Sequence, residues 1–290
     1  MILAALWGGS FLFMRVAAPE LGPVTLAGLR LGIAALVIVP LLAATRGFGD
    51  LRGRLWPVLV VGALNSALPF CLLTYATLSV TAGFASILNA TTPLWGGLVA
   101  HFWLRDRLDR SRAAGLAVGF AGVAFLVWGR ASFKPGGAGL AVVAALLATL
   151  SYGVAASFTK RRLAGVNSLA VAAGSQAAAA LLLLPAALWA WPAHPVSARA
   201  WISVTLLAVL CTAFAYVLFF RLIAHVGPAR AVSVTFLIPP FAVLWGAVFL
   251  GEPLTSRMVL GSAVIFTGTA LATGLARLPG REAATPARAG

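Results

Sequence analysis

Ten apolar runs of about twenty residues, separated by short loops, constrain this chain more than any other feature. A helix needs about 20 apolar residues to cross the roughly 30 Å hydrocarbon core of a bilayer. Runs such as 140–150 lack the strict alternation expected of barrel strands. We therefore predict an all-α integral membrane protein with ten transmembrane helices. The predicted spans are 2–18, 24–44, 56–77, 82–104, 112–129, 139–159, 168–190, 201–221, 229–250 and 258–275.

The net charge of +15 is better explained by membrane topology than by nucleic-acid binding. Proteins that bind nucleic acids gather basic residues on one soluble face, whereas here these residues occupy short loops. One set of alternate loops, with the tail, carries 15 Arg and Lys, and the other set carries 5. Cytoplasmic loops hold the excess of positive charge. We expect a multi-pass protein of the inner membrane, in contact with lipid, with both termini in the cytoplasm and no nucleic-acid partner.

The two halves of the sequence repeat each other at a shift of 145–146 residues. The matching positions are Trp7-Gly8 with Tyr152-Gly153, Arg15 with Lys160, Pro93 with Pro239, 104–108 with 250–254, and Gly115 and Gly122 with Gly261 and Gly268. Each copy holds five segments, and this odd number makes the second copy enter the membrane from the opposite side. We predict two inverted-topology five-helix repeats, 1–130 and 138–275, and a disordered cytoplasmic tail, 276–290. Such repeats make alternating access natural.

Several motifs resemble those of EamA-type members of the drug/metabolite transporter superfamily. They are Trp7-Gly8-Gly9-Ser10-Phe11, Leu29-Arg30 and Leu250-Gly251-Glu252-Pro253-Leu254-Thr255. The first repeat departs from the pattern, with Arg105-Asp106 where Gly-Glu is usual. The resemblance covers residues 1 to about 275. It implies a ten-helix carrier, and many members of the family are bacterial exporters of amino acids and other metabolites.

Prolines inside two apolar segments mark the candidate substrate site. Because proline has no N–H, Pro93 releases the carbonyl of Asn89, and Pro239 releases that of Thr235. Lipid cannot satisfy such groups. We predict that Asn89 and Thr235 line a cavity at mid-membrane, with Pro93, Pro239 and Pro240 as hinges. The alternative is that the prolines only kink the helices and that nearby Ser or Thr hydroxyls bind the freed carbonyls.

Aromatic and polar side chains deep in the segments complete the predicted site. Buried Trp and Tyr need a polar partner, which favours a pocket wall over a lipid face. Amide and hydroxyl side chains at this depth can bind a solute or tie helices together. The predicted substrate-binding residues are Trp7, Asn65, Asn89, Trp95, Tyr152, Gln176, Tyr216, Thr235 and Trp245.

Arg30 is the charged residue that lies well inside a predicted segment. It could bind a substrate carboxylate, or it could snorkel to the interface or bond a neighbouring helix. The second interpretation is favoured here, because the repeat counterpart of Arg30 is Ser175 and its long side chain can reach outward.

The apolar segments contain no Asp or Glu, which narrows the expected substrate class. Carriers of hydrophobic cations usually hold a membrane carboxylate, and phosphorylated substrates favour paired basic groups. By elimination, we expect a secondary transporter for a small neutral or zwitterionic metabolite, such as an amino acid, working in the direction of export.

Three other functions are weighed: a carrier for efflux of drugs or toxic compounds, a passive channel and an intramembrane enzyme. The sequence has no P-loop and no His-Glu-x-x-His motif. We predict no catalytic residue, no metal and no cofactor. The expected state is a monomer or homodimer that takes a small-molecule substrate.

Overall fold

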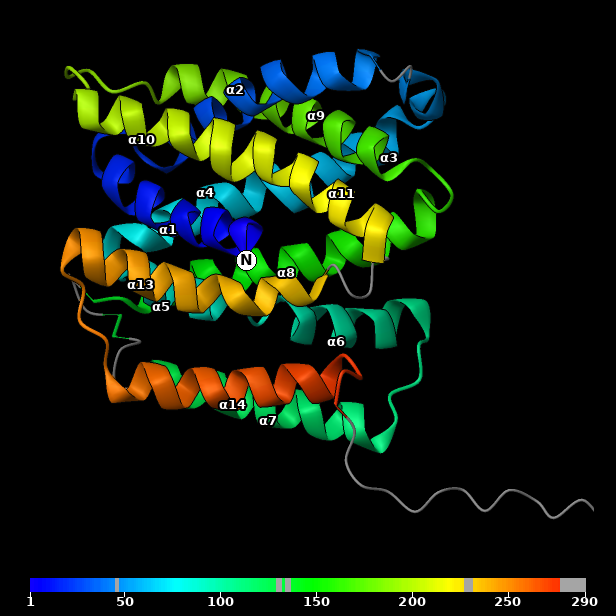
Figure 1. Cartoon of the computed structure of the whole chain (residues 1–290), viewed down its shortest axis with the longest axis vertical. Coiled ribbons are helices and arrows are strands. Elements are labelled where there is room, and N and C mark those ends of the chain that lie inside the picture. The colour runs from blue at the N-terminus through cyan, green and yellow to red at the C-terminus, as the bar shows by residue number, and fades with distance from the viewer. Residues whose placement is uncertain (45–46, 129–131, 134–136, 227–231, 277–290) are drawn as a thin grey trace, which may run out of the picture.

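The computed structural model describes residues 1–44, 47–128, 132–133, 137–226 and 232–276. The elements of the first half are α1 (Ile2–Leu21), α2 (Pro23–Ala44), η1 (Gly47–Leu51), α3 (Leu55–Gly62), η2 (Ala63–Ala67), α4 (Leu68–Ser79), α5 (Ala82–Asn89), α6 (Thr92–Leu104) and α7 (Arg110–Val127). Those of the second half are α8 (Gly139–Arg162), α9 (Ser168–Trp189), α10 (Ala198–Ala208), η3 (Val209–Phe214), α11 (Ala215–Val226), η4 (Val232–Leu237), α13 (Ile238–Leu250) and α14 (Ser256–Ala272). Figure 1 shows these helices lying side by side in one bundle.

Within the described residues, the elements make ten membrane crossings. Seven crossings are helices that are long and apolar enough to span a bilayer, namely 2–21, 23–41, 55–79, 110–127, 139–162, 168–189 and 198–219. The other three are α5 with α6, η4 with α13, and the 17-residue helix α14. The prediction of an all-α membrane protein with ten transmembrane helices in two inverted five-helix repeats is confirmed.

The packing of the helices follows a two-fold relation between the halves. Helix α1 packs against α13 and α10, and its counterpart α8 packs against α6 and α4. Two further pairs with extensive contact join a helix to its own counterpart, α2 with α9 and α7 with α14. Inverted repeats related by an axis in the membrane plane require this pattern. In such an arrangement, a contact between two non-equivalent crossings has a symmetry-related copy in the other half. A helix that packs against its own counterpart must lie at the two-fold axis.

The predicted spans 82–104 and 229–250 are broken rather than continuous helices. Helix α5 ends at Asn89, and Pro93 lies in the first turn of the new helix α6. In the second half, α13 follows the 3₁₀ segment η4, and Pro239 and Pro240 lie in its first turn. A missing N–H costs nothing there, because the first turn has no partner for it. The prolines therefore start new helices instead of kinking old ones.

Two π-helical segments interrupt equivalent crossings of the two halves. They are η2, between α3 and α4, and η3, between α10 and α11. Their first residues, Ala63 and Val209, differ by the repeat shift. A π segment is rare and is frequently found at a functional site. The first segment supplies Asn65 to the site described below, and the second supplies Thr212, which hydrogen-bonds a residue of that site.

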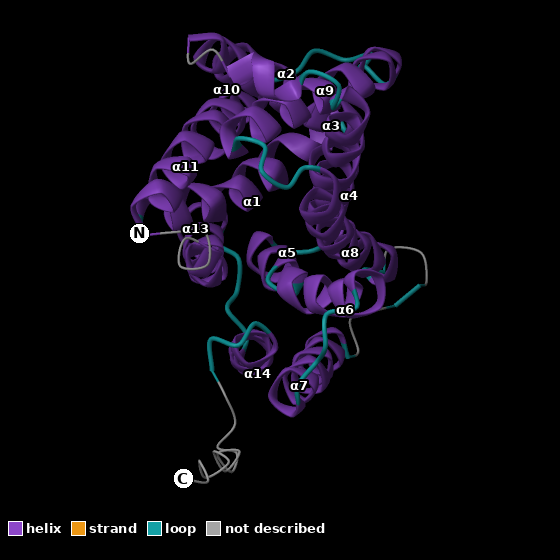
Figure 2. Ribbon diagram, turned by 90° about the vertical axis from the view of Figure 1, so that its right-hand side faces the viewer, coloured by secondary structure: helices purple, strands orange, loops and turns teal. Residues whose placement is uncertain are grey.

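Helices α7 and α14 form a closely packed pair at one edge of the bundle (Figures 1 and 2). A Cβ atom added to Gly268 would lie 2.2 Å from the backbone nitrogen of Gly119. A Cβ atom on Gly115 would lie 2.3 Å from the backbone nitrogen of Ala272. Small residues let helix backbones approach within a membrane. These glycines therefore serve the internal packing of one repeat against the other.

Candidate substrate cavity

A cavity of about 300 Å³ lies between the two repeats. The first repeat contributes side chains from α1, α2, η2, α4, α5 and α6, and the second contributes side chains from α8, α11, η4 and α13. Binding pockets for drug-sized ligands span roughly 300–1,000 Å³. This cavity is at the lower limit of that range and suits a small metabolite.

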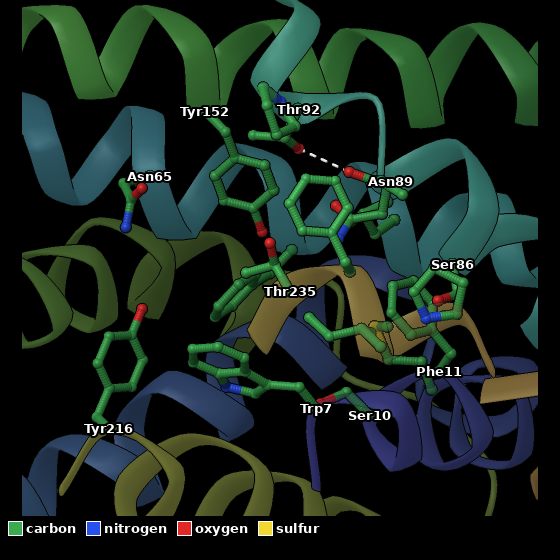
Figure 3. A pocket seen from close by; sticks show the side chains of 18 of the residues that line it. Trp7, Ser10, Phe11, Asn65, Ser86, Asn89, Thr92, Tyr152, Tyr216 and Thr235 are labelled. Carbon is green, nitrogen blue, oxygen red and sulfur yellow. Dashed lines mark hydrogen bonds between the residues drawn. The ribbon is translucent and has the colours of Figure 1, made fainter. Parts of the chain in front are cut away.

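Most of the predicted substrate-binding residues meet at this cavity. The lining includes Trp7, Asn65, Asn89, Tyr152, Tyr216 and Thr235, together with Pro93 and Pro239. Figure 3 shows the side chains of Trp7 and Tyr152 approaching the middle of the cavity from opposite repeats. Trp95, Gln176, Trp245 and Pro240 are not among the lining residues. A role in substrate binding, or as a hinge for the prolines, stays a prediction for all of these residues.

The two deep tryptophans outside the cavity contact neighbouring helices. The ring of Trp95 packs edge-on against Phe120 of α7, with 4.9 Å between ring centroids. The indole N–H of Trp245 donates to the carbonyl of Ala5 at 3.0 Å, which ties α13 to α1. Both residues lie well inside their predicted segments, as Trp7 does, but their side chains contact other helices.

Gln176 of α9 is only 1% exposed and is not among the lining residues, but its side chain lies beside that of Tyr216, which lines the cavity. Neither its amide nitrogen nor its amide oxygen has a hydrogen-bond partner among the described residues. Burying a polar group without a partner is costly. Because Gln176 borders a lining residue, its role in substrate binding stays a prediction.

The repeated aromatic–glycine pair explains how the cavity walls are built. A Cβ atom on Gly8 would lie 2.7 Å from Cβ of Phe241 in α13. A Cβ atom on Gly153 would lie 2.9 Å from the backbone nitrogen of Gly96 in α6. Helices α13 and α6 are the second pieces of the two broken crossings. Glycine therefore lets the first helix of each repeat pass close to the broken crossing of the other, and the preceding aromatic residue lines the cavity.

The group of Asn89 that is available to a solute is its side chain, and not the backbone carbonyl released by Pro93. The hydroxyl of Thr92 donates to that carbonyl at 2.8 Å (Figure 3). A nearby hydroxyl therefore binds the freed carbonyl of Asn89, as the alternative interpretation of the sequence expected. The amide oxygen Oδ1 of Asn89 is buried and has no partner among the described residues. A solute in the cavity can supply the missing donor.

Several cavity residues are absent from the predicted set, although helical periodicity could have found two of them. Ser10 follows Trp7 by three positions, and Ser86 precedes Asn89 by three. Residues three or four apart share one face of a helix. Phe11, Met14, Phe70 and Phe236 also line the cavity, and only the packing of distant helices brings them together.

Arg30 also lines the cavity and is 6% exposed, so it does not snorkel to the interface. Its Nε atom donates to the hydroxyl of Thr212, in the π segment η3, at 2.9 Å. Among the described residues that line the cavity, Arg30 is the one with a charged side chain. No group of three or more His, Cys, Asp or Glu in the described part of the chain could hold a metal ion.

Comparison with known proteins identifies relatives along almost the whole chain. The uncharacterized transporter YvbV of Bacillus subtilis is 27% identical over 93% of this chain and 88% of its own. A probable terminal-alkyne amino-acid exporter of Streptantibioticus cattleyicolor is 28% identical over 97% of this chain and 94% of its own. The uncharacterized inner membrane transporter YedA of Escherichia coli is 27% identical over 93% of this chain and 88% of its own.

A solved crystal structure superposes with a TM-score of 0.62 and 24% identity, over 94% of this chain and 96% of that chain, which supports the fold alone. The model of the EamA-like transporter family matches the chain twice, over residues 1–128 and 139–274. Each match covers one of the two repeats that meet at the cavity. This chain is therefore a multi-pass membrane protein of the EamA-like transporter family, within the drug/metabolite transporter superfamily.

Proposed function

We propose that this protein is a secondary carrier that exports a small neutral or zwitterionic metabolite, such as an amino acid, by alternating access. The observation that carries the proposal is the cavity bounded by the two broken crossings, one from each repeat. Transporters built from inverted repeats bind substrates between the repeats, at helices interrupted near mid-membrane. The presence of a probable amino-acid exporter among the relatives supports the substrate class.

A difference between equivalent ends of the two repeats supports alternating access. Arg15 lies 3.7 Å from the carboxylate of Glu252. The repeat shift relates this pair to Lys160 and Asp106, yet Asp106 lies 3.9 Å from Arg112 instead. Lys160 forms no ion pair within the described residues. In any one state of a carrier that works by alternating access, one end is closed and the equivalent end is open. The two repeats must therefore make different contacts at these ends, as they do here.

We infer from the distribution of basic loops that both termini lie in the cytoplasm and that the protein resides in the inner membrane. The Arg15–Glu252 pair then lies near the outer face. The boundaries 1–130 and 138–275 are proposed for the two repeats. The predicted tail, 276–290, lies almost wholly outside the described residues. We propose a small-molecule substrate and a monomer or homodimer as the working state.

Counterflow in liposomes tests the proposal. Purified protein is reconstituted, and the liposomes are preloaded with an unlabelled amino acid, sugar or nucleoside before the labelled form is added outside. A carrier accelerates uptake of the label, with and without a pH gradient, because a loaded site returns faster than an empty one. A passive channel gives no acceleration. Counterflow with sugars or nucleosides but with no amino acid would contradict the substrate class.

A further inference from the structure

The side chain of Arg30 extends from the first half of α2 into the wall of the cavity. Three groups hold the guanidinium. The hydroxyl of Thr212 accepts from Nε at 2.9 Å, Met14 Sδ lies 3.8 Å from Nη1, and Cζ lies 3.7 Å from the ring centroid of Phe70. These contacts come from η3, α1 and α4, so both repeats fix the orientation of this one cation.

None of these contacts neutralises the charge. The ion pairs of the described residues join Arg15 to Glu252, and Arg112 to Asp106 and Asp109, so Arg30 has no acidic partner among them. A guanidinium keeps its proton in proteins. A buried charge without a counter-ion is strongly unfavourable. Ionisable side chains inside membrane proteins face water-filled cavities or partners and mark substrate paths.

The available hydrogen-bonding capacity of Arg30 favours an anionic ligand. Thr212 takes the Nε donor, whereas the thioether of Met14 is a weak acceptor for Nη1. A guanidinium binds a carboxylate through a planar pair of N–H donors. With one cation in the described lining, a single carboxylate balances the charge, while a doubly charged phosphate would leave an excess.

The rest of the lining suits a solute with an apolar body and a second polar group. Phe11, Leu73 and Phe236 supply apolar surface. The Ser86 hydroxyl oxygen and Asn89 Oδ1 are buried without partners among the described residues. Both can accept N–H bonds, which is what an ammonium group needs. An apolar amino acid offers a carboxylate, an ammonium group and an apolar side chain within one small molecule.

We propose that Arg30 binds the carboxylate of the solute, so that the ligands of this cavity are small monocarboxylates, with apolar zwitterionic amino acids as the best match. This proposal rests on the proposed transport function in one respect, namely that the molecule bound at Arg30 is the solute that the carrier transports. Arg30 is then a specificity-determining residue. It rejects organic cations by repulsion and binds uncharged analogues of an amino acid weakly.

Equilibrium binding to purified protein in lipid nanodiscs tests the site directly. The probes are L-phenylalanine, 3-phenylpropionate, L-phenylalaninamide and phenethylamine, measured by isothermal titration. We expect the two carboxylates to bind wild-type protein at least about tenfold more tightly than the amide and the amine, a factor of ten being 1.4 kcal/mol. If neither carboxylate binds, or if the amide binds as well as the acids, the proposal is overturned by the wild-type protein alone.

Substitutions then assign the selectivity to Arg30. R30M removes the charge while keeping a long side chain, and it should abolish the preference for carboxylates. R30K keeps the charge without the planar donors and should retain part of the preference. R199M makes the same charge change at an exposed position outside the cavity and should leave all four affinities unchanged. Selectivity that survives in folded R30M, shown by a normal elution profile and thermal transition, would overturn the assignment.

Counterflow of labelled L-phenylalanine in liposomes separates this proposal from the transport function. Carboxylate binding that depends on Arg30 without counterflow of any solute would contradict the carrier function and leave the binding site standing. Counterflow that is equally selective for carboxylates in wild-type protein and R30M would support a carrier and overturn the role of Arg30.

Discussion

Both carboxylate oxygens of Glu252 accept hydrogen bonds from the backbone N–H of Ala82, at 3.0 and 2.9 Å. Glu252 lies in the connection between α13 and α14, and Ala82 is the first residue of α5. Arg15 of α1 approaches the same carboxylate and donates to the carbonyls of Thr77 and Leu78. One acidic side chain therefore joins elements of both repeats at the end that we assign to the outer face.

Weakening this junction should open the outer end of the cavity more often. E252Q keeps an acceptor for Ala82 but loses the ion pair, and E252A loses both. A partly exposed ion pair contributes about 1 kcal/mol or less, which corresponds to at most about a fivefold change in population. Labelling of a cysteine at position 89 by an impermeant maleimide from the outer face should rise up to about fivefold in E252Q and further in E252A.

The control for this series is D106N, at the repeat counterpart of Glu252. Asp106 contributes only an ion pair with Arg112, both side chains being well exposed. Labelling from the outer face should therefore stay at the level of the parent protein. Equal labelling rates in all four proteins would show that the Glu252 junction does not hold the outer end closed.

The close approach of α1 to α13 depends on Gly8 but not on the neighbouring Gly9. In G8A the new methyl group would lie within 3.0 Å of Phe241 Cβ, Ala242 N and Ile238 O. We expect slower counterflow, because α13 must shift at the cavity wall. In G9A the nearest atom would lie 3.7 Å away, an ordinary contact, so transport should be unchanged. Equal rates in the two variants would contradict the packing argument.

The glycine contacts between α7 and α14 should govern stability. In G268A the methyl group would meet the backbone of Gly119 at 2.2–2.4 Å. Overpacking of this kind costs about 1–3 kcal/mol, and the midpoint of thermal unfolding in detergent should fall. G32A is the matched control, since no atom lies within 4 Å of its new methyl group. Alanine is favoured over glycine in a helix by about 0.5–1 kcal/mol, so that midpoint should rise.

The fold could be predicted from the sequence because the bilayer imposes a length and an apolar composition on each crossing. The repeat shift also relates residues that prove to be structurally equivalent. Trp7 and Tyr152 line the cavity from opposite repeats, and the glycines that follow them make corresponding contacts with α13 and α6. Sequence symmetry thus identified the central side chains without knowledge of any contact.

The directions of single side chains were less accessible to sequence reasoning. Trp95 and Trp245 lie well inside their predicted segments, but their side chains contact Phe120 and the carbonyl of Ala5. Depth along a helix follows from residue number, whereas direction around its axis depends on helix phase. New helices start at Thr92 and at Ile238, which resets the phase expected for continuous spans. The site of Arg30 depended likewise on partners 16 or more residues away.

The π segments η2 and η3 left no signal in the hydropathy pattern. Asn65 and Thr212 lie inside them, at positions that the repeat shift nearly superposes. A π segment changes the hydrogen-bonding pattern of the backbone by one residue. Hydropathy averaged over a span does not report such a local change, so these segments required the structure.

Arg105 has a left-handed backbone conformation, with φ of 57°, at the position that Gly251 occupies in the second repeat with φ of 64°. This conformation costs a residue with a Cβ atom about 1–2 kcal/mol. The greater freedom of glycine in the unfolded chain offsets about 0.5–1 kcal/mol. R105G should therefore raise the thermal midpoint modestly. G251A introduces a Cβ atom at the equivalent left-handed position of the second repeat and should lower the thermal midpoint. A lower midpoint for R105G would contradict this expectation and would mean that the Arg105 side chain of the wild-type protein stabilises the loop.

The central claim is that one cavity between the repeats opens in turn to each side of the membrane. The most direct test places single cysteines at position 89 or 235 in a protein whose native Cys71 and Cys211 have been replaced. Impermeant thiol reagents are then applied to each side of oriented vesicles. We predict labelling of both positions from both sides, and slower labelling when a transported solute is present. No labelling from either side, or labelling from one side only under all conditions, would contradict the account.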